Sequence, residues 1–161
     1  MKKTSLILLV LIAALSLTAC SYKKPDRYTV KDLGVDSITT VCGTDCSLSD
    51  INVATAGSNC SASYSYTNVA DSRGLQDAKT YYDYLAGEST CVKIDNFSEE
   101  TGTFTAYIGN PETIASEDTE DKNGEKKVAL GICIKVSFDA ESYTVTITDN
   151  INLDEVLQRS G

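Results

Sequence analysis

The amino-acid sequence predicts an α+β fold, in which a meander of antiparallel β-strands carries one main helix, at about residues 72–86, packed on one face. Two observations predict it. In the second half of the chain, apolar and polar residues alternate over several short segments, as they do in strands with one buried face. A single segment before them repeats its apolar residues at the spacing of a helix that packs on one side.

The segments before the helix show the weakest patterns. Residues 28–41 contain alternating fragments, which predict one or two short strands. Residues 42–63 are mostly small and polar, so we expect a loop there, which can include a short strand at residues 51–54. Residues 63–69 alternate again and predict a strand.

The main helix is expected between residues 71 and 88. Its apolar stripe recurs at i, i+3, i+7 and i+10 and consists of Leu75, Ala78, Tyr82 and Leu85. Tyr81 flanks this stripe, Asp71 or Ser72 can cap the start, and Gly87 stands where a left-handed residue often ends a helix. We expect the stripe to lie on the sheet.

Four strands are expected after the helix. Residues 91–94 and 103–108 alternate and form a hairpin, and residues 128–136 and 143–148 form two longer strands. Each long strand is apolar on one side and polar on the other, so the sheet has one covered face, with the helix as its cover. The end of the chain can add a helical turn that buries Leu153, Val156 and Leu157.

The connection at residues 110–127 is acidic and contains Asn123-Gly124, a strong signal for a tight turn. Its acidity suggests a Ca²⁺ loop, but the EF-hand pattern does not fit. With Gly124 at the sixth position of that pattern, Thr119 and Leu130 occupy the first and twelfth positions, where carboxylates are needed. We therefore predict no metal site.

The N-terminus has the layout of an export signal. Lys2 and Lys3 precede an uncharged apolar run from Leu6 to Leu17, which is too short for a spanning helix of about 20 residues. The run ends in Leu17-Thr18-Ala19-Cys20, which resembles the lipobox of bacterial lipoprotein precursors. The alternative is an ordinary secretory signal with a chance cysteine at the cleavage site.

The lipobox resemblance implies that the Cys20 thiol receives a diacylglyceryl group and that cleavage follows Ala19. Residues 1–19 would then be a lipoprotein signal peptide, 20–27 a lipidated tether and 28–161 a single α+β domain. Several acyl chains hold a protein firmly at a membrane. We therefore expect a protein anchored to the cell membrane or outer envelope by the lipid on Cys20, facing outside the cytoplasm.

The composition excludes several kinds of function. The formal net charge is −9, and the signal peptide supplies two of the 14 basic residues and none of the 23 acidic ones. Such a chain lacks the basic surface that nucleic-acid binding needs. The chain has no His, which removes Ser-His-Asp and Cys-His catalytic sets and most zinc sites. We name no catalytic residue and expect no cofactor.

Five cysteines follow Cys20, namely Cys42, Cys46, Cys60, Cys91 and Cys133. Outside the cytoplasm, disulfides are permitted, so structural bridges are the leading hypothesis and buried reduced thiols the alternative. The Cys-x₃-Cys spacing of Cys42 and Cys46 is not that of a redox pair. Cys91 and Cys133 could meet if their strands pair, and a local bridge could join two of Cys42, Cys46 and Cys60.

Parts of the domain resemble small exported or membrane-anchored proteins of Gram-positive bacteria, in which a Tyr-x-Tyr strand leads to a helix and a closing hairpin ends Tyr-Thr-Ile-Thr. The residues that carry this resemblance are Tyr64, Tyr66, Asn68, Val69, Tyr81, Leu85, Tyr143, Thr144 and Thr146. The resemblance implies the same α+β fold and no site.

The sequence therefore indicates a membrane-anchored extracytoplasmic lipoprotein with a non-catalytic binding, adaptor or envelope-structural role. Its partner would be an envelope protein or an extracellular ligand. The alternative is a small extracytoplasmic enzyme or a metal-binding module that uses surface carboxylates. A pocket with converging carboxylates would favour the enzyme. An exposed tyrosine patch or an open sheet edge would favour partner binding.

Overall fold

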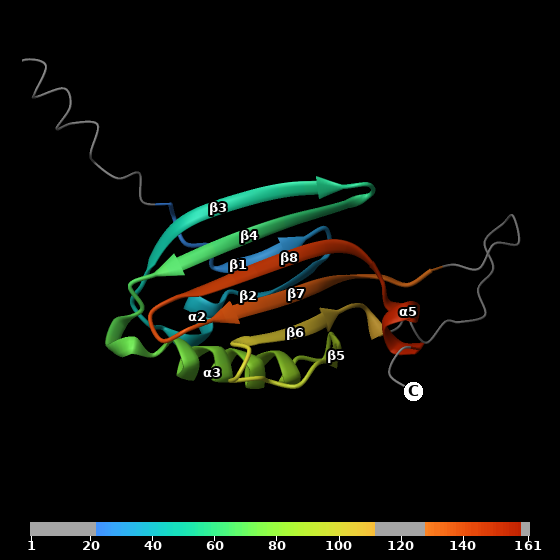
Figure 1. The fold of residues 1–161 in the computed structure, drawn as a ribbon. Helices are drawn as coiled ribbons and strands as arrows, with labels where there is room; N and C mark the ends of the chain where they lie inside the picture. The colour runs from blue at the N-terminus through green and yellow to red at the C-terminus, as the bar shows by residue number, and fades with distance from the viewer. Residues whose placement is uncertain (1–21, 112–127, 159–161) are drawn as a thin grey trace, which may run out of the picture.

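The fold is that of a computed structural model, which describes residues 22–111 and 128–158 (Figure 1). The first elements are β1 (Arg27–Val30), β2 (Leu33–Asp36), α2 (Ile38–Cys42), β3 (Ser47–Ala56) and β4 (Asn59–Thr67). They are followed by η1 (Ala70–Ser72), α3 (Gly74–Gly87), β5 (Cys91–Ile94), β6 (Thr103–Ile108), β7 (Leu130–Phe138), β8 (Tyr143–Asn152) and α5 (Leu153–Gln158). The lipobox and the Asn123-Gly124 turn lie outside the described residues.

The main sheet has six antiparallel strands in the order β3-β4-β8-β7-β6-β5. The predicted α+β class is therefore confirmed. Strands β5 to β8 form the expected meander, but the β3–β4 hairpin continues the sheet beside β8, not beside β5. Helix α3 makes the connection from β4 to β5 and so carries the chain to the opposite edge of the sheet (Figure 1).

One face of the sheet is covered by two structures together. Helix α3 packs on β5, β6 and β7. The β1–β2 hairpin covers β4, because the rings of Tyr28 and Tyr64 lie 5.1 Å apart and the hydroxyls of Tyr28 and Tyr66 are hydrogen-bonded at 3.0 Å. The prediction of one helix as the cover was therefore incomplete, since the N-terminal hairpin and α2 supply the rest of it.

The core lies between these elements and the sheet. Its fully buried large side chains are Tyr28, Tyr66, Tyr81, Tyr143, Ile38, Leu85, Ile108, Ile132, Ile134, Leu153, Val35 and Val136. The tail prediction is confirmed for Leu153, which α5 buries, and Val156 and Leu157 are half-buried. Because four of these side chains are tyrosines, their buried hydroxyl groups need hydrogen-bond partners inside the domain.

The helix is rotated relative to its predicted face. Tyr81 is fully buried, whereas Leu75 is 40% exposed. The cap prediction is also wrong, because α3 begins only at Gly74, and Asp71 and Ser72 precede it with φ values of 57° and 51°. Gly74 packs directly against the carbonyl groups of the β7–β8 turn, which fixes where the helix can start.

The predicted loop at residues 42–63 is wrong. It contains most of a hairpin, in which the ten-residue strand β3 pairs with β4 across a two-residue turn. Gly57 opens this turn with a φ of 62°, a conformation that glycine adopts easily. The side chains of β3 are mostly exposed and small, so the strand lacks the apolar alternation that identifies strands in a sequence.

Candidate functional site

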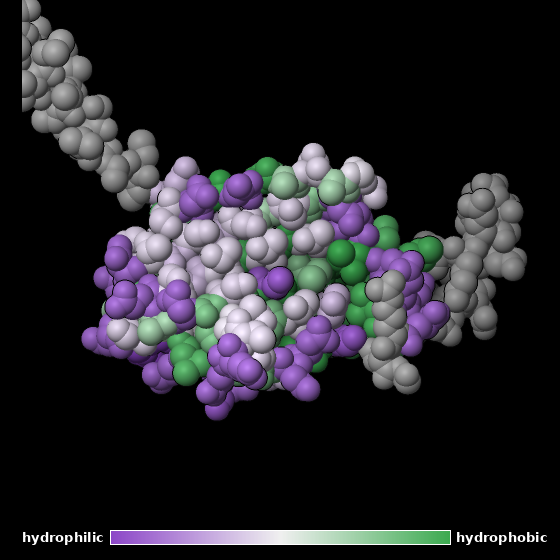
Figure 2. Space-filling model, viewed as in Figure 1, coloured by the Kyte–Doolittle hydropathy of each residue, from purple (hydrophilic) through white to green (hydrophobic). Residues whose placement is uncertain are grey.

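The face of the main sheet that faces away from α3 is rich in hydroxyl groups, and no described helix or hairpin packs on it. We call it the hydroxyl face and define it by Ser61, Ser63 and Ser65 on β4, Thr144, Thr146 and Thr148 on β8, Cys133, Lys135 and Ser137 on β7, and Thr103, Thr105 and Tyr107 on β6. These residues alternate with the buried core residues of the same strands. In Figure 2 the sheet is mostly pale, as Ser, Thr and Tyr are on its scale.

The strand register aligns these side chains in rows across the sheet. One row runs from Ser63 through Thr146 and Lys135 to Thr105. The hydroxyls of Ser63 and Thr146 are 2.8 Å apart and hydrogen-bonded, and those of Ser65 and Thr144 are 3.4 Å apart. These two bonds fix the hydroxyl groups of Ser63, Thr146, Ser65 and Thr144 relative to one another.

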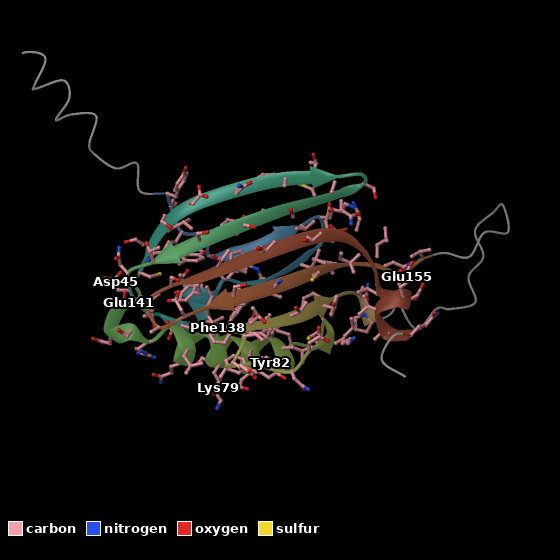
Figure 3. The ribbon with its side chains drawn as sticks, viewed as in Figure 1. Asp45, Lys79, Tyr82, Phe138, Glu141 and Glu155 are labelled. Carbon is pink, nitrogen blue, oxygen red and sulfur yellow. The ribbon has the colours of Figure 1, made fainter. Side chains whose placement is uncertain are left out.

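The charge of the hydroxyl face differs from that of the chain. None of the residues that define it is acidic, although the chain carries 23 acidic residues, and the nearest carboxylates are Asp50, opposite Ser65 on β3, and Asp95, which lies near Cys133. The exposed acidic side chains labelled in Figure 3, Asp45, Glu141 and Glu155, lie at the ends of the sheet. Lys135 stands in the centre of the face and is exposed. An anionic or neutral polar ligand therefore meets less repulsion here than on the acidic rest of the surface.

The two edges of the sheet are built differently. The edge strand β5 has four residues, a register shift between Cys91 and Lys93, and the Lys93 ammonium, which donates a hydrogen bond to the carbonyl of Val156 at 3.4 Å. The edge strand β3 has ten residues and, beyond its register shift between Leu48 and Asp50, contains no proline, lysine or further shift. Strand β5 is short, shifted and carries a lysine, all features that usually prevent edge-to-edge pairing, whereas the protective features of β3, its register shift and Asp50, are confined to its start.

A cavity of about 570 Å³ lies between the β1–β2 turn and the ends of β7 and β8. Its polar groups already bind one another. The Lys31 ammonium donates to the Asn150 side chain at 2.8 Å, Asn150 donates to the carbonyl of Ser58 at 2.6 Å, and an Asp149 oxygen accepts the N–H of Cys60 at 2.6 Å. These bonds tie two turns to the end of β8, which is a structural role.

The five cysteines after Cys20 are free thiols in this structure. Cys91 packs against the covered core, Cys133 lies on the hydroxyl face, and β6 separates their strands, so a bridge between them is wrong. The two strands are about 9.5 Å apart, beyond the reach of a disulfide.

The local bridge to Cys60 is also wrong. Cys46 precedes Ser47, which pairs with Thr67, and Cys60 lies seven residues before Thr67 on β4. The separation is therefore about 23 Å at the rise of a strand, far beyond disulfide geometry. A bridge between Cys42 and Cys46 stays a prediction.

Cys42 and Cys46 contact a buried polar cluster that the sequence did not reveal. Cys42 donates a hydrogen bond to the carbonyl of Asp77 at 3.3 Å, and the Tyr143 hydroxyl donates to the Cys46 sulfur at 3.4 Å. The fully buried Asp77 carboxylate accepts the Thr44 hydroxyl at 3.0 Å. Burial, and then the nearby Asp77, raises the pKa of Cys42 to about 12, so this thiol is not a nucleophile at neutral pH.

The remaining chemistry of the described residues is sparse. In residues 22–111 and 128–158, no three Cys, Asp or Glu side chains come together as a metal-binding set. No helix in these ranges is long and apolar enough to cross a membrane. The lipidation site Cys20 lies before them.

No protein-family model, curated protein or solved structure matches this chain. The two resemblances noted in its sequence therefore stay predictions.

Proposed function

We propose that this protein is a lipid-anchored extracytoplasmic binding protein without catalytic activity, and that the hydroxyl face contacts its ligand. The observation that carries this proposal is the composition of the face. All its residues except Cys133 and Lys135 bear a hydroxyl group, none is acidic, and they occupy four adjacent strands of an otherwise acidic protein. The nearest carboxylates are at its borders, Asp50 on β3 opposite Ser65 and Asp95 beside Cys133, so the four central strands form a carboxylate-poor area of an acidic protein.

The chemistry of the face fits an extended, hydroxyl-rich polymer, namely a neutral or anionic glycan of the cell envelope. Serine and threonine hydroxyls both donate and accept hydrogen bonds, as sugar hydroxyls do. Lys135 adds one positive charge at the centre, where an anionic group on the glycan can bind. The face has rows of such groups along four strands, which suits a chain that lies across the strands.

The predicted lipid anchor supports this proposal, because it would hold the hydroxyl face outside the cytoplasm, where envelope glycans are. The N-terminal export signal and the lipobox cysteine Cys20 predict a domain tethered outside the cytoplasm by residues 20–27. A tether of this length lets the domain turn its hydroxyl face toward polymers next to the membrane. The anchor and the face together support a role in attaching the membrane to envelope glycan.

The anchor is tested by Cys20→Ser. We expect this variant in the soluble fraction after cell breakage, whereas the wild-type protein sediments with membranes and incorporates labelled fatty acid. A variant that stays membrane-bound and still incorporates the label would overturn the lipobox assignment.

The binding surface is tested with the mature chain carrying Cys20→Ser and with isolated cell-wall sacculi as the probe. We expect cosedimentation that Lys135→Glu weakens about tenfold, as the reversal of one central contact of about 1.4 kcal/mol would. The matched control is Lys79→Glu, because Lys79 is an exposed lysine on α3 that points away from the sheet (Figure 3). Equal loss in both variants, or no binding by the wild-type chain, would refute the proposal.

A further inference from the structure

Within residues 22–111 and 128–158, no strand pairs with the outer side of β3, and the hairpin determines which of its backbone groups face outward. The turn closes on the pair Ala56 and Asn59, and in a two-residue hairpin this closing pair exchanges hydrogen bonds. Because bonded and non-bonded pairs alternate, Ile51, Val53 and Thr55 direct their N–H and C=O groups away from β4.

The contact of Cys60 supports this phase. Cys60 is the β4 residue opposite Thr55, and its N–H donates to the Asp149 side chain and not to β3. The pair is therefore non-bonded, as the alternation requires, and Thr55 is free to bond outward.

We propose that two copies of this chain associate through β3, with antiparallel strands related by a two-fold axis at Val53. In this register Val53 faces Val53 of the second copy, and Ile51 faces Thr55 of the second copy on both sides of the axis. All three outward-directed residues of each strand are then paired, which gives about six backbone hydrogen bonds. The two six-stranded sheets become one continuous sheet.

The side chains and charges of β3 fit this occupant. Val53 is 64% exposed, the largest exposure among the large apolar side chains of the described residues, and the pairing places it against its own copy. Asp50 is the one charged residue of β3 and faces Ala56 of the second copy, so no like charges lie opposite each other. Without the two lysines of the signal peptide, each mature copy carries 12 basic and 23 acidic side chains, a net charge of −11, so added salt should strengthen the association.

The β5 edge limits the proposed assembly to two copies. Head-to-tail pairing of β3 with β5 of another copy would extend without limit. Strand β5 is short and shifted in register, and it carries the charged side chain of Lys93. These three features disfavour pairing with a strand of another copy. In the symmetric contact the β3 strands of the two copies pair with each other, so the only edges of the joined main sheet left among the described strands are the two β5 strands. The inference rests on the β3 edge alone and is independent of the proposed ligand.

The first test is sedimentation of the mature chain carrying Cys20→Ser over a range of protein and salt concentrations. We expect a monomer–dimer equilibrium that Val53→Pro shifts at least tenfold toward monomer. Proline at this position removes an outward N–H and no bond to β4, so the hairpin is retained. The matched control Val53→Thr keeps the N–H and a similar shape and should dimerise as the wild type does.

The second test remains informative even if the proline variant fails to fold. In a Cys60→Ser background, Val53→Cys should give a dimer with a short bismaleimide, because the two cysteines meet at the axis. Ala56→Cys should not, because the two copies of residue 56 lie about 20 Å apart in this register. A wild-type chain that is monomeric throughout, oligomers that grow beyond two copies, or equal cross-linking at both positions would overturn the proposal.

Discussion

Gly74→Ala tests how closely the start of α3 approaches the β7–β8 turn. A Cβ atom at Gly74 would lie 1.9 Å from the carbonyl oxygen of Asp139 and 3.0 Å from that of Ala140. The N–H of Gly74 also donates a hydrogen bond of 3.0 Å to Ala140. The methyl group therefore forces the helix and the turn apart by about 1 Å, since both neighbours are backbone atoms that cannot rotate away.

The magnitude follows from two losses and one gain. Overpacking of this kind costs about 1–3 kcal/mol. The weakened hydrogen bond costs about 1 kcal/mol more. Alanine recovers part of this, because it is a better helix former than glycine by up to about 1 kcal/mol. Together these contributions lower the free energy of unfolding by about 1–4 kcal/mol.

The assay is urea unfolding of the soluble mature chain, followed by circular dichroism. The matched control is Gly87→Ala at the other end of the same helix, where no atom lies within 4 Å of the new methyl group. That variant should be more stable than the wild type by about 0.5–1 kcal/mol. If both substitutions stabilised the chain, the close contact at Gly74 and the placement of α3 on the turn would be refuted.

Three further predictions concern the polar interior. Arg73→Ala should destabilise the chain by about 2 kcal/mol, because it removes the cation 3.6 Å from the buried Asp77 carboxylate, while Lys79→Ala should change the free energy of unfolding by less than about 0.5 kcal/mol. Burial raises the pKa values of Cys42 and Tyr66 to about 12 from ordinary values of 9.0 and 10.0. The urea midpoint should therefore hold below about pH 9 and fall as the pH rises through 12, and an unchanged midpoint at pH 11.5 would contradict this. Under reducing conditions at pH 8, iodoacetamide should label the exposed Cys60 well before Cys42, as peptide mass spectrometry would show.

The strands of the second half were predictable because each buries a full apolar side. In β8, Tyr143, Val145 and Ile147 are buried and the threonines between them are not, so the pattern is complete in the sequence itself. The sequence of strand β3 has no such alternation of buried and exposed residues. Its place is determined by backbone bonds to β4, which any small polar residue can make, and so its sequence resembles a loop.

The sequence predicted the polar side of single strands but not that these sides join into the hydroxyl face. The polar sides of residues 128–136 and 143–148 were predicted, yet nothing local indicates that β4 lies beside β8. Asp77 was missed for a related reason. A carboxylate on a helix usually faces water, and only the packing of Thr44 and Arg73 around it makes its burial tolerable.

The position of β8 in the sheet has a consequence for biogenesis. It is the C-terminal strand of the described residues, and it lies between β4 and β7, which are joined through it alone. Before β8 pairs, the folding chain can form only two incomplete sheets, each with an unpaired inner edge. Closing them requires a contact between residues 61–66 and 143–148, which is slow because of the long intervening chain. A chain truncated before β8 would therefore lack the strand that joins β4 to β7, and we expect such a fragment to be sensitive to proteases.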